Sequence, residues 1–243
     1  FEIRYAHAAI CTGYWYTGPA GKIRLSNGIL RYNDMALVAR VAYAELDGDN
    51  LLIVNNVHAI AGRNTAEITL RNSTIADNSS YSEGKFTIFT FENDIFAFNG
   101  GSIIEVMSPT DLLVRNSLFQ GVDATAVVGY LGADAFGRGG NLTGDPLFVD
   151  HAAGNYELAP GSLAIDAGRG IGASAIDFLG RLRYDDPGMA NIGAGSPSYV
   201  DMGAFERQEP SPAADLAVTR VADPTVVDVR PGDTTTINWT VTN

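Results

Sequence analysis

A short pattern of asparagine and apolar residues recurs along the first half of the chain. After Asn27 and after Asn72, an apolar residue follows three positions later and a second Asn follows six positions later. The same six-residue step begins at Asn93, and weaker copies begin at Asn55 and Asn116. These five anchors are 28, 17, 21 and 23 residues apart. The pattern therefore predicts a structural repeat with a period of about 23 residues.

Short segments typical of strands lie beside the anchors. Their apolar residues alternate or run together in residues 23–25, 51–54, 67–71, 86–89 and 112–115. One short strand on each side of an Asn is typical of one coil of a parallel β-helix, which buries its apolar residues by stacking on its neighbours. We therefore predict an all-β fold, with about six coils over residues 1–140.

The anchor residues are interpreted as structural. Asn tolerates left-handed backbone geometry at a tight corner, and its amide both donates to and accepts from the same amide one coil away. We therefore expect a ladder formed by Asn27, Asn55, Asn72, Asn93 and Asn116. The unequal intervals predict loops, mainly in residues 11–22, 34–50 and 79–85, and residues 35–46 fit a short helix as well as they fit a strand.

Charge and cysteine content exclude several functions. The 243 residues include 16 Lys plus Arg and 28 Asp plus Glu, for a net charge of −12. This balance argues against nucleic-acid binding through phosphate neutralisation. The single cysteine, Cys11, excludes an intrachain disulfide and a Cys-based zinc site. The longest nearly uncharged apolar stretch, residues 124–133, is about half the length that spans a bilayer, so we expect no membrane insertion.

Residues 141–206 resemble a known family. The segment from Asn141 to Gly168 contains Gly-Asp-Pro-Leu-Phe-Val-Asp and Gly-Asn-Tyr-Glu-Leu-Ala-Pro-Gly-Ser, and an Asp-led turn and Asp-Met-Gly-Ala-Phe-Glu follow at 177–181 and 201–206. Together they are similar to the C-terminal portion of bacterial right-handed parallel β-helix proteins called choice-of-anchor Q. Leu163 stands where proline is usual, and residues 189–198 are an extra loop. The resemblance implies a right-handed β-helix, and we interpret this block as a cap on its open end.

A second resemblance begins after a proline-containing linker at residues 207–213. Residues 214–243 are similar to the opening strands of immunoglobulin-like repeats in large bacterial surface proteins. A complete domain of this kind has about 100 residues, so we expect a truncated repeat in a fragment of a longer protein. Its unpaired strand edges suggest completion by another chain, that is, self-association into filaments.

Two sets of residues are candidate ligand sites. Tyr14, Trp15 and Tyr16 lie in a Gly-flanked loop, where exposed aromatic rings can stack on sugar rings, although packing over an apolar edge is the stronger interpretation. Asp47 and Asp49 offer oxygen ligands around a glycine, as calcium prefers. No downstream Glu completes an EF-hand loop, so a hydrophilic turn is favoured over a calcium site. We predict no other cofactor.

No catalytic set emerges from the sequence. The same fold family includes polysaccharide lyases and hydrolases. Residues 149–151 weakly resemble a lyase motif, but they lie inside the family block and are interpreted as non-catalytic. Asp77, Asp94 and Asp111 have different offsets from the Asn register, so we do not expect them to share a face, and the three histidines are dispersed.

The leading hypothesis is a non-enzymatic structural or adhesive module of an extracellular or bacterial cell-surface protein, with a polysaccharide or cell-surface glycan as partner. The alternative is a fragment of a β-helix polysaccharide lyase or glycoside hydrolase.

Overall fold

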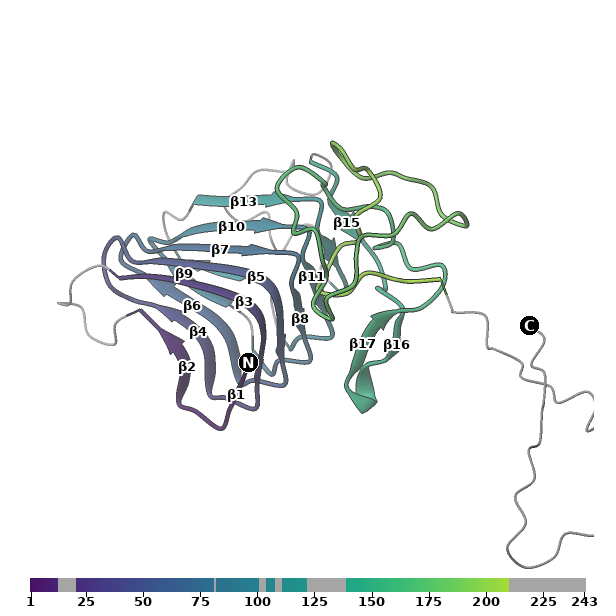
Figure 1. Cartoon of the computed structure of the whole chain (residues 1–243). Helices are drawn as coiled ribbons and strands as arrows, with labels where there is room; N and C mark the ends of the chain where they lie inside the picture. Colours follow the sequence, from purple (N-terminus) through teal and green to yellow (C-terminus); the bar gives the residue numbers. More distant parts are fainter. Residues whose placement is uncertain (13–20, 81, 101–103, 108–110, 122–138, 210–243) are drawn as a thin grey trace, which may run out of the picture. The chain divides into compact units, whose positions relative to one another are not determined.

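The computed structural model describes residues 1–12, 21–80, 82–100, 104–107, 111–121 and 139–209 (Figure 1). The chain divides into two units, Phe1–Arg207 and Gln208–Asn243. The first unit is a parallel β-solenoid of about four turns. The predicted immunoglobulin-like strands at residues 214–243 lie outside the described residues.

Two parallel sheets run along the solenoid (Figure 1). In the first sheet, β3 (Lys22–Arg31) and β5 (Glu45–Val54) each continue through a corner, whereas later turns divide into pairs of strands. These pairs are β7 (Glu67–Arg71) with β8 (Thr74–Ala76), β10 (Ile88–Glu92) with β11 (Ile95–Ala97), and β13 (Asp111–Arg115) with β14 (Leu118–Phe119). The second sheet contains β2 (Ala8–Cys11), β4 (Met35–Ala39), β6 (His58–Arg63), β9 (Ser82–Lys85) and β12 (Ile104–Met107).

The remaining elements flank the two sheets. Strand β1 (Glu2–Arg4) pairs with β3, and β15 (Leu142–Thr143) adds a short parallel strand after β14. Strands β16 (Phe148–Asp150) and β17 (Asn155–Leu158) form an antiparallel hairpin around the 3-10 helix η1 (His151–Ala153). Among the described residues, no helix is long and apolar enough to cross a membrane.

The core lies between the two sheets and is filled by one apolar side chain above another. In its later turns the core is aromatic: the ring centroids of Phe91 and Phe96 are 5.1 Å apart, and those of Phe96 and Phe119 are 5.0 Å apart. All three rings are buried. Each turn therefore buries its inward residues against the next turn, as the repeat predicted.

The structure resolves the choice between helix and strand at residues 35–46 in favour of strands, and two of the predicted loops contain strands. Residues 35–39 form β4, all five of whose residues are buried, and β5 begins at Glu45. Residues 82–85 form β9 in the same sheet as β4. The apolar run in β4 is typical of a buried parallel strand, whose backbone groups bond to the neighbouring turns instead of within the segment.

An Asn occupies the same outer corner in successive turns. The strand register aligns Asn27, Asn50, Asn72, Asn93 and Asn116, which are 23, 22, 21 and 23 residues apart. Each has a positive φ between 43° and 59°, a conformation that Asn tolerates better than most residues. The amide nitrogens of Asn50 and Asn93 donate to Asn27 and Asn72 at 3.2 and 3.0 Å. Asn50 therefore occupies the second position of the outer corner.

Asn55, which the sequence placed in this ladder, lies at a different corner. Its carbonyl accepts a hydrogen bond from the Tyr32 amide, and it shares positive φ with Tyr32 and Asp77. The Asn50 repeat was missed because Asp47, Gly48 and Asp49 before it are typical of a turn. With Asn50 in the register, the apparent intervals of 28 and 17 residues become nearly equal.

A second Asn ladder runs through the interior, six residues after the outer corner. The Nδ2 atoms of Asn33, Asn56 and Asn78 each donate to the Oδ1 atom of the next ladder residue, at 3.0, 3.0 and 2.9 Å. The last acceptor is Asn99. Backbone amides donate to the same oxygens, so the ladder also binds the turns of the main chain. It satisfies polar groups that would otherwise be buried unpaired.

The C-terminal segment packs along the side of the solenoid. It forms hydrogen bonds with four successive turns. The side-chain amides of three corner residues donate to its backbone carbonyls: Asn50 to Ile176, Asn93 to Arg169 and Asn116 to Ala167. In the remaining turn, the Thr74 hydroxyl accepts from the Ala204 amide. The sequence predicted closure of the open end, whereas these contacts cover a face. The reason is that β5, β8, β11 and β14 have apolar side chains pointing outward as well as inward, so this face requires a cover.

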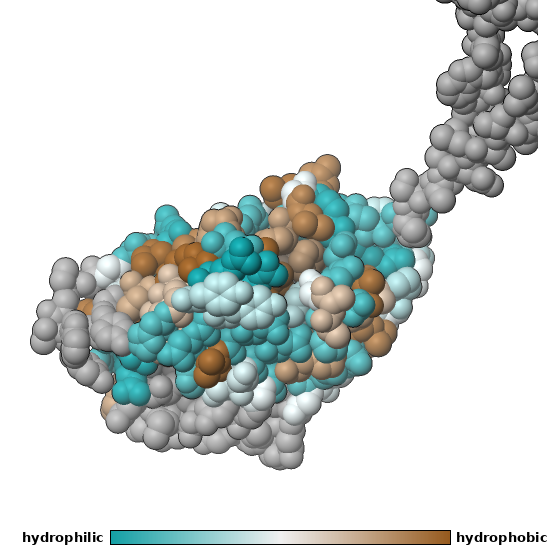
Figure 2. All heavy atoms as spheres, turned by 90° about the horizontal axis from the view of Figure 1, so that it is seen from below, coloured by the Kyte–Doolittle hydropathy of each residue, from teal (hydrophilic) through white to brown (hydrophobic). Residues whose placement is uncertain are grey.

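Much of the remaining surface is polar. The face shown in Figure 2 is mostly hydrophilic, and its apolar side chains form small, separate patches. Single exposed apolar residues are normal for a globular surface, so these patches do not by themselves indicate a docking face.

Candidate functional site

An open groove lies on the outer face of β3, β5 and β7. Its volume is about 570 Å³, and its lining residues are Arg24, Leu25, Ser26, Asp47, Asp49, Arg71 and Gly172. Because successive side chains of a strand point to opposite faces, Asp47 and Asp49 point to the same side of β5. The register sets Arg24 beside Asp47 and Arg71 beside Asp49. The groove therefore presents acidic and basic groups in alternation.

Ion pairs hold these groove side chains in place. The Asp47 carboxylate lies 2.7 Å from Arg71 Nη1 and 3.7 Å from Arg24 Nε, and Asp49 Oδ1 accepts a hydrogen bond from Asn72 Nδ2 at 2.7 Å. The side chains of Asp47, Arg24 and Arg71 are each about one-third exposed or more. Solvent therefore screens these ion pairs, and their contribution to stability is small. The groove is therefore preorganised while its polar atoms remain accessible.

The two aspartates do not form the hydrophilic turn that the sequence predicted, because residues 45–54 are one continuous strand. Arg71 and Asn72 each already contact one oxygen of these carboxylates and would compete with a calcium ion for it. In the described parts of the chain, no group of three or more His, Cys, Asp or Glu side chains is arranged to hold a metal ion. The other candidate, the aromatic loop of Tyr14, Trp15 and Tyr16, lies outside the described residues.

A second pocket lies where the β16–β17 hairpin meets the solenoid. Its volume is about 410 Å³. The carboxylate oxygen Oδ2 of Asp77 lies 3.1 Å from His151 Nδ1, and it accepts a hydrogen bond from the Tyr156 hydroxyl at 2.9 Å. Burial, reinforced by the Asp77 charge, raises the pKa of Tyr156, so its hydroxyl stays protonated and acts as a donor.

Sequence reasoning missed this second pocket. In the sequence, Asp77 belongs to a set of carboxylates without a shared register, and His151 belongs to a weak motif and to three dispersed histidines. The two residues are 74 positions apart. They meet only because the hairpin packs against the outward apolar residues of β5 and β8, and no local spacing predicts that contact.

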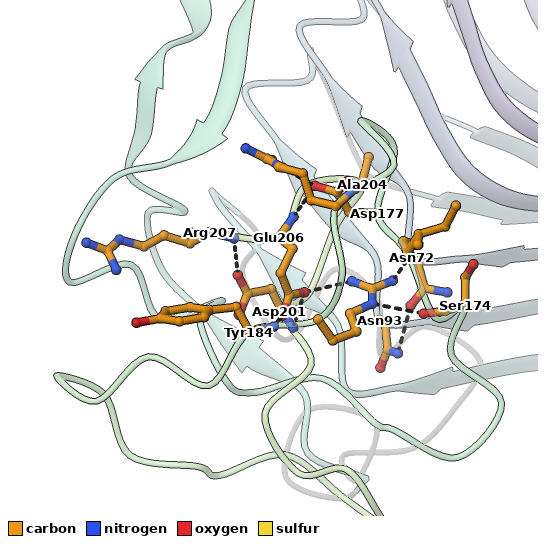
Figure 3. A network of polar contacts seen from close by, with 12 residues as sticks. Asn72, Asn93, Ser174, Asp177, Tyr184, Asp201, Ala204, Glu206 and Arg207 are labelled. Carbon is orange, nitrogen blue, oxygen red and sulfur yellow. Dashed lines mark hydrogen bonds and ion pairs between the residues drawn. The ribbon is translucent and has the colours of Figure 1, made fainter. Parts of the chain in front are cut away.

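A third polar cluster holds the irregular C-terminal segment in place. Figure 3 shows Asp177, Asp201 and Glu206 gathered beside the corner residues Asn72 and Asn93. The Asp177 carboxylate accepts hydrogen bonds from the backbone amides of residues 179, 181 and 206. The Asp201 carboxylate accepts hydrogen bonds from the backbone amides of residues 166 and 207. After β17 the described chain has no strands, so its backbone amides lack partners in a sheet, and these carboxylates accept their hydrogen bonds instead. Their role is structural.

Glu206 and its partner Arg183 are the most buried ion pair of this cluster. Glu206 Oε2 lies 2.8 Å from Arg183 Nη1, and the exposed fractions of the two side chains are 0% and 6%. Glu206 also accepts hydrogen bonds from the backbone amides of Tyr184 and Asp201. Burial raises the pKa of Glu206, and Arg183 opposes that rise.

Asp166 differs from its neighbours because its carboxylate is buried without a direct hydrogen bond. Burial, followed by the charge of Asp185, raises the pKa of Asp166 to about 7. This carboxyl group is a weak point in the C-terminal segment at alkaline pH.

Comparison with known proteins provides no assignment for the chain: no protein-family model, no curated protein and no solved structure matches it.

Proposed function

We propose that the chain is a structural or adhesive module of an extracellular or bacterial cell-surface protein, and that its outer groove binds a neutral glycan. The observation that carries this proposal is the open groove on β3, β5 and β7, in which Asp47, Asp49 and Arg71 are held at fixed positions on a rigid sheet. Functional side chains held on strands are positioned more accurately than side chains on loops.

The chemistry of the groove suits sugar hydroxyl groups. A hydroxyl both donates and accepts, so it can bind a carboxylate oxygen and a guanidinium N–H at the same time. The net charge of −12 produces a field that repels anionic polysaccharides. A neutral glycan therefore fits this groove better than an acidic one.

The finer structural assignments belong to the same proposal. Residues 141–206 would be the closing region of a right-handed β-helix of the choice-of-anchor Q type, residues 207–213 a linker, and residues 214–243 the start of an immunoglobulin-like repeat that another chain completes. The hydrogen bonds of residues 141–206 to four successive turns support an integral role for this block as a cover of the solenoid. Self-association through residues 214–243 stays a prediction.

One observation favours the enzymatic alternative enough to test it. Asp47 and Asp49 point to the same side of one strand and both line the groove, which is the kind of carboxylate pair that glycoside hydrolysis requires. Ion pairs with Arg71 and Arg24 already occupy the Asp47 carboxylate, however. This pairing favours binding over hydrolysis.

The test is affinity electrophoresis of the purified chain through gels that contain neutral or acidic polysaccharides. We expect at least one neutral polysaccharide to retard the protein, and the double substitution D47N/D49N to weaken the retardation by tenfold or more. Glu67→Gln, on β7 but outside the groove lining, is the matched control. If no neutral polysaccharide retards the protein, or if D47N/D49N is retarded as strongly as the unmodified protein, glycan binding in the groove is refuted. Release of reducing ends would favour the hydrolase.

A further inference from the structure

The pocket beneath the β16–β17 hairpin combines an apolar floor with a polar end. Leu52 and Val54 point outward from β5 and line the pocket, and the residues of η1 and Gly154 line it as well. Its volume of about 410 Å³ lies within the range of small-molecule sites, which is about 300 to 1,000 Å³. Neither the solenoid nor the hairpin forms this pocket alone.

The polar end contains a fixed pair of titratable groups. Asp77 uses Oδ2 for both His151 and Tyr156, so its second oxygen, Oδ1, is left for a ligand. His151 directs its ring nitrogen Nδ1 to Asp77, so Nε2 is the ring nitrogen that is left for a ligand. The ring of Phe98 stacks on the imidazole with centroids 3.9 Å apart and fixes its plane. Asn55 Nδ2 donates to the Tyr156 hydroxyl at 3.3 Å and completes the network.

An exposed aromatic wall borders the pocket. The side chain of Tyr32 lines it and is 46% exposed. Tyr5, one turn earlier, stacks on Tyr32 with ring centroids 5.9 Å apart, and the Arg31 guanidinium lies 5.6 Å from the Tyr32 centroid. Arg31 is already paired with Glu2 at 2.6 Å. The wall therefore offers an ordered ring face with little uncompensated charge.

We propose that this pocket binds one pyranose ring of a neutral sugar. The apolar face of the ring lies against Leu52, Val54 and Tyr32, and two adjacent hydroxyl groups reach Asp77 Oδ1 and His151 Nε2. Aromatic rings favour such contacts because a pyranose presents an apolar C–H face. A neutral ligand is favoured because Arg31 is already paired with Glu2, so no unpaired basic group that lines the pocket is offered to an anionic ligand, and the Asp77 carboxylate would repel one. The site shares no residue with the groove on β3, β5 and β7 and does not depend on it.

The inference is tested by saturation-transfer difference NMR and titration calorimetry with neutral monosaccharides and their uronic-acid counterparts. We expect saturation transfer to the C–H protons of at least one neutral pyranose. Asp77→Asn and Tyr32→Ala should each weaken binding at least tenfold. Ala153→Leu fills the pocket without changing any of the contacts described above, and it should abolish binding even if Asp77→Asn disturbs the hairpin.

Two controls keep this site separate from the groove. His7→Ala removes the histidine of another His–Asp pair, with Asp34 at 2.7 Å, outside the pocket, and it should bind the sugar normally. The groove variant D47N/D49N should also keep monosaccharide binding. Saturation transfer from no neutral sugar, binding of uronic acids alone, or equal binding by Ala153→Leu and the unmodified protein would each overturn the proposal.

Discussion

The solenoid and its C-terminal segment solve the same problem by different means. In the solenoid, buried backbone and amide groups find partners one turn away, so a single Asn position repeats as the ladder of Asn33, Asn56, Asn78 and Asn99. The C-terminal segment has few strands, and there carboxylates of Asp177, Asp201 and Glu206 accept the amides individually. Repetition shares the stabilisation among many similar bonds, whereas the irregular segment depends on a few unique ones.

The largest expected effect is loss of the C-terminal segment in Glu206→Ala. This change leaves the buried Arg183 guanidinium without its counter-charge and two amides without their acceptor, which costs about 3 to 5 kcal/mol. Hydrogen exchange should show lost protection within residues 160–207, while β5, β7 and β10 stay protected. Equal loss of protection in both regions would mean that the two regions unfold as one unit. Glu209→Gln, which changes an exposed acid just beyond Arg207, is the control.

A somewhat smaller but global effect is expected for Asn56→Ala. The Asn56 amide accepts from Asn33 and donates to Asn78, and both neighbours are buried. Its removal leaves buried polar groups unpaired in two adjacent turns, at a cost of about 2 to 4 kcal/mol. Denaturant unfolding should show a lower midpoint with an unchanged slope. The exposed Asn191, changed to Ala, should have an effect below about 0.5 kcal/mol.

The stability of the protein should depend on pH through Asp166. The folded-state pKa of Asp166 is raised to about 7, above its ordinary value, so the folded state binds more protons than the unfolded state between these values. The stability that protonated Asp166 contributes to the folded state is therefore fully present below about pH 4, and it is lost as the pH rises through 7. Asp166→Asn should be more stable than the unmodified protein at pH 8, on the order of 2 kcal/mol, with the difference shrinking towards pH 4. Thermal unfolding across this range tests it, and a constant difference would contradict it.

The smallest effect is expected on the exposed surface of the solenoid. Lys22 and Glu45 form an ion pair between β3 and β5, and both side chains are more than 40% exposed. Solvent and salt screen such a pair, so Lys22→Ala should change the free energy of unfolding by less than about 0.5 kcal/mol. Denaturant unfolding at low and high salt provides the measurement. A loss above 1 kcal/mol would show that surface charges, and not only ladders, hold the turns together.

Local patterns revealed the fold because the repeat places the same chemistry at the same position every turn. The six-residue Asn step marks an outer corner residue and an inner ladder residue, as Asn72 and Asn78 illustrate. The same pattern was ambiguous at Asn50 and Asn55, where only the strand register decides which residue occupies the corner. Residues 35–39 were ambiguous for a related reason, since a buried apolar run has no clear period.

The candidate sites were less accessible from sequence. Asp47 and Asp49 were identified, but their surroundings were not, because Arg24 and Arg71 reach them from neighbouring turns. Asp77 and His151 carry no local signal that joins them. Their contact requires the hairpin to dock on the side of the solenoid, and that docking follows from apolar residues on two faces of the strands.

The sequence by itself determined the all-β repeat, its average period and the identity of the corner residue, because these depend on spacings of a few tens of residues. Tertiary structure alone decided that residues 141–206 cover a face of the solenoid, and it alone created the pocket between that cover and β5. The physical reason is that outward apolar residues must be buried, but many segments can bury them. Only the folded chain specifies which one does, and which polar groups it brings along.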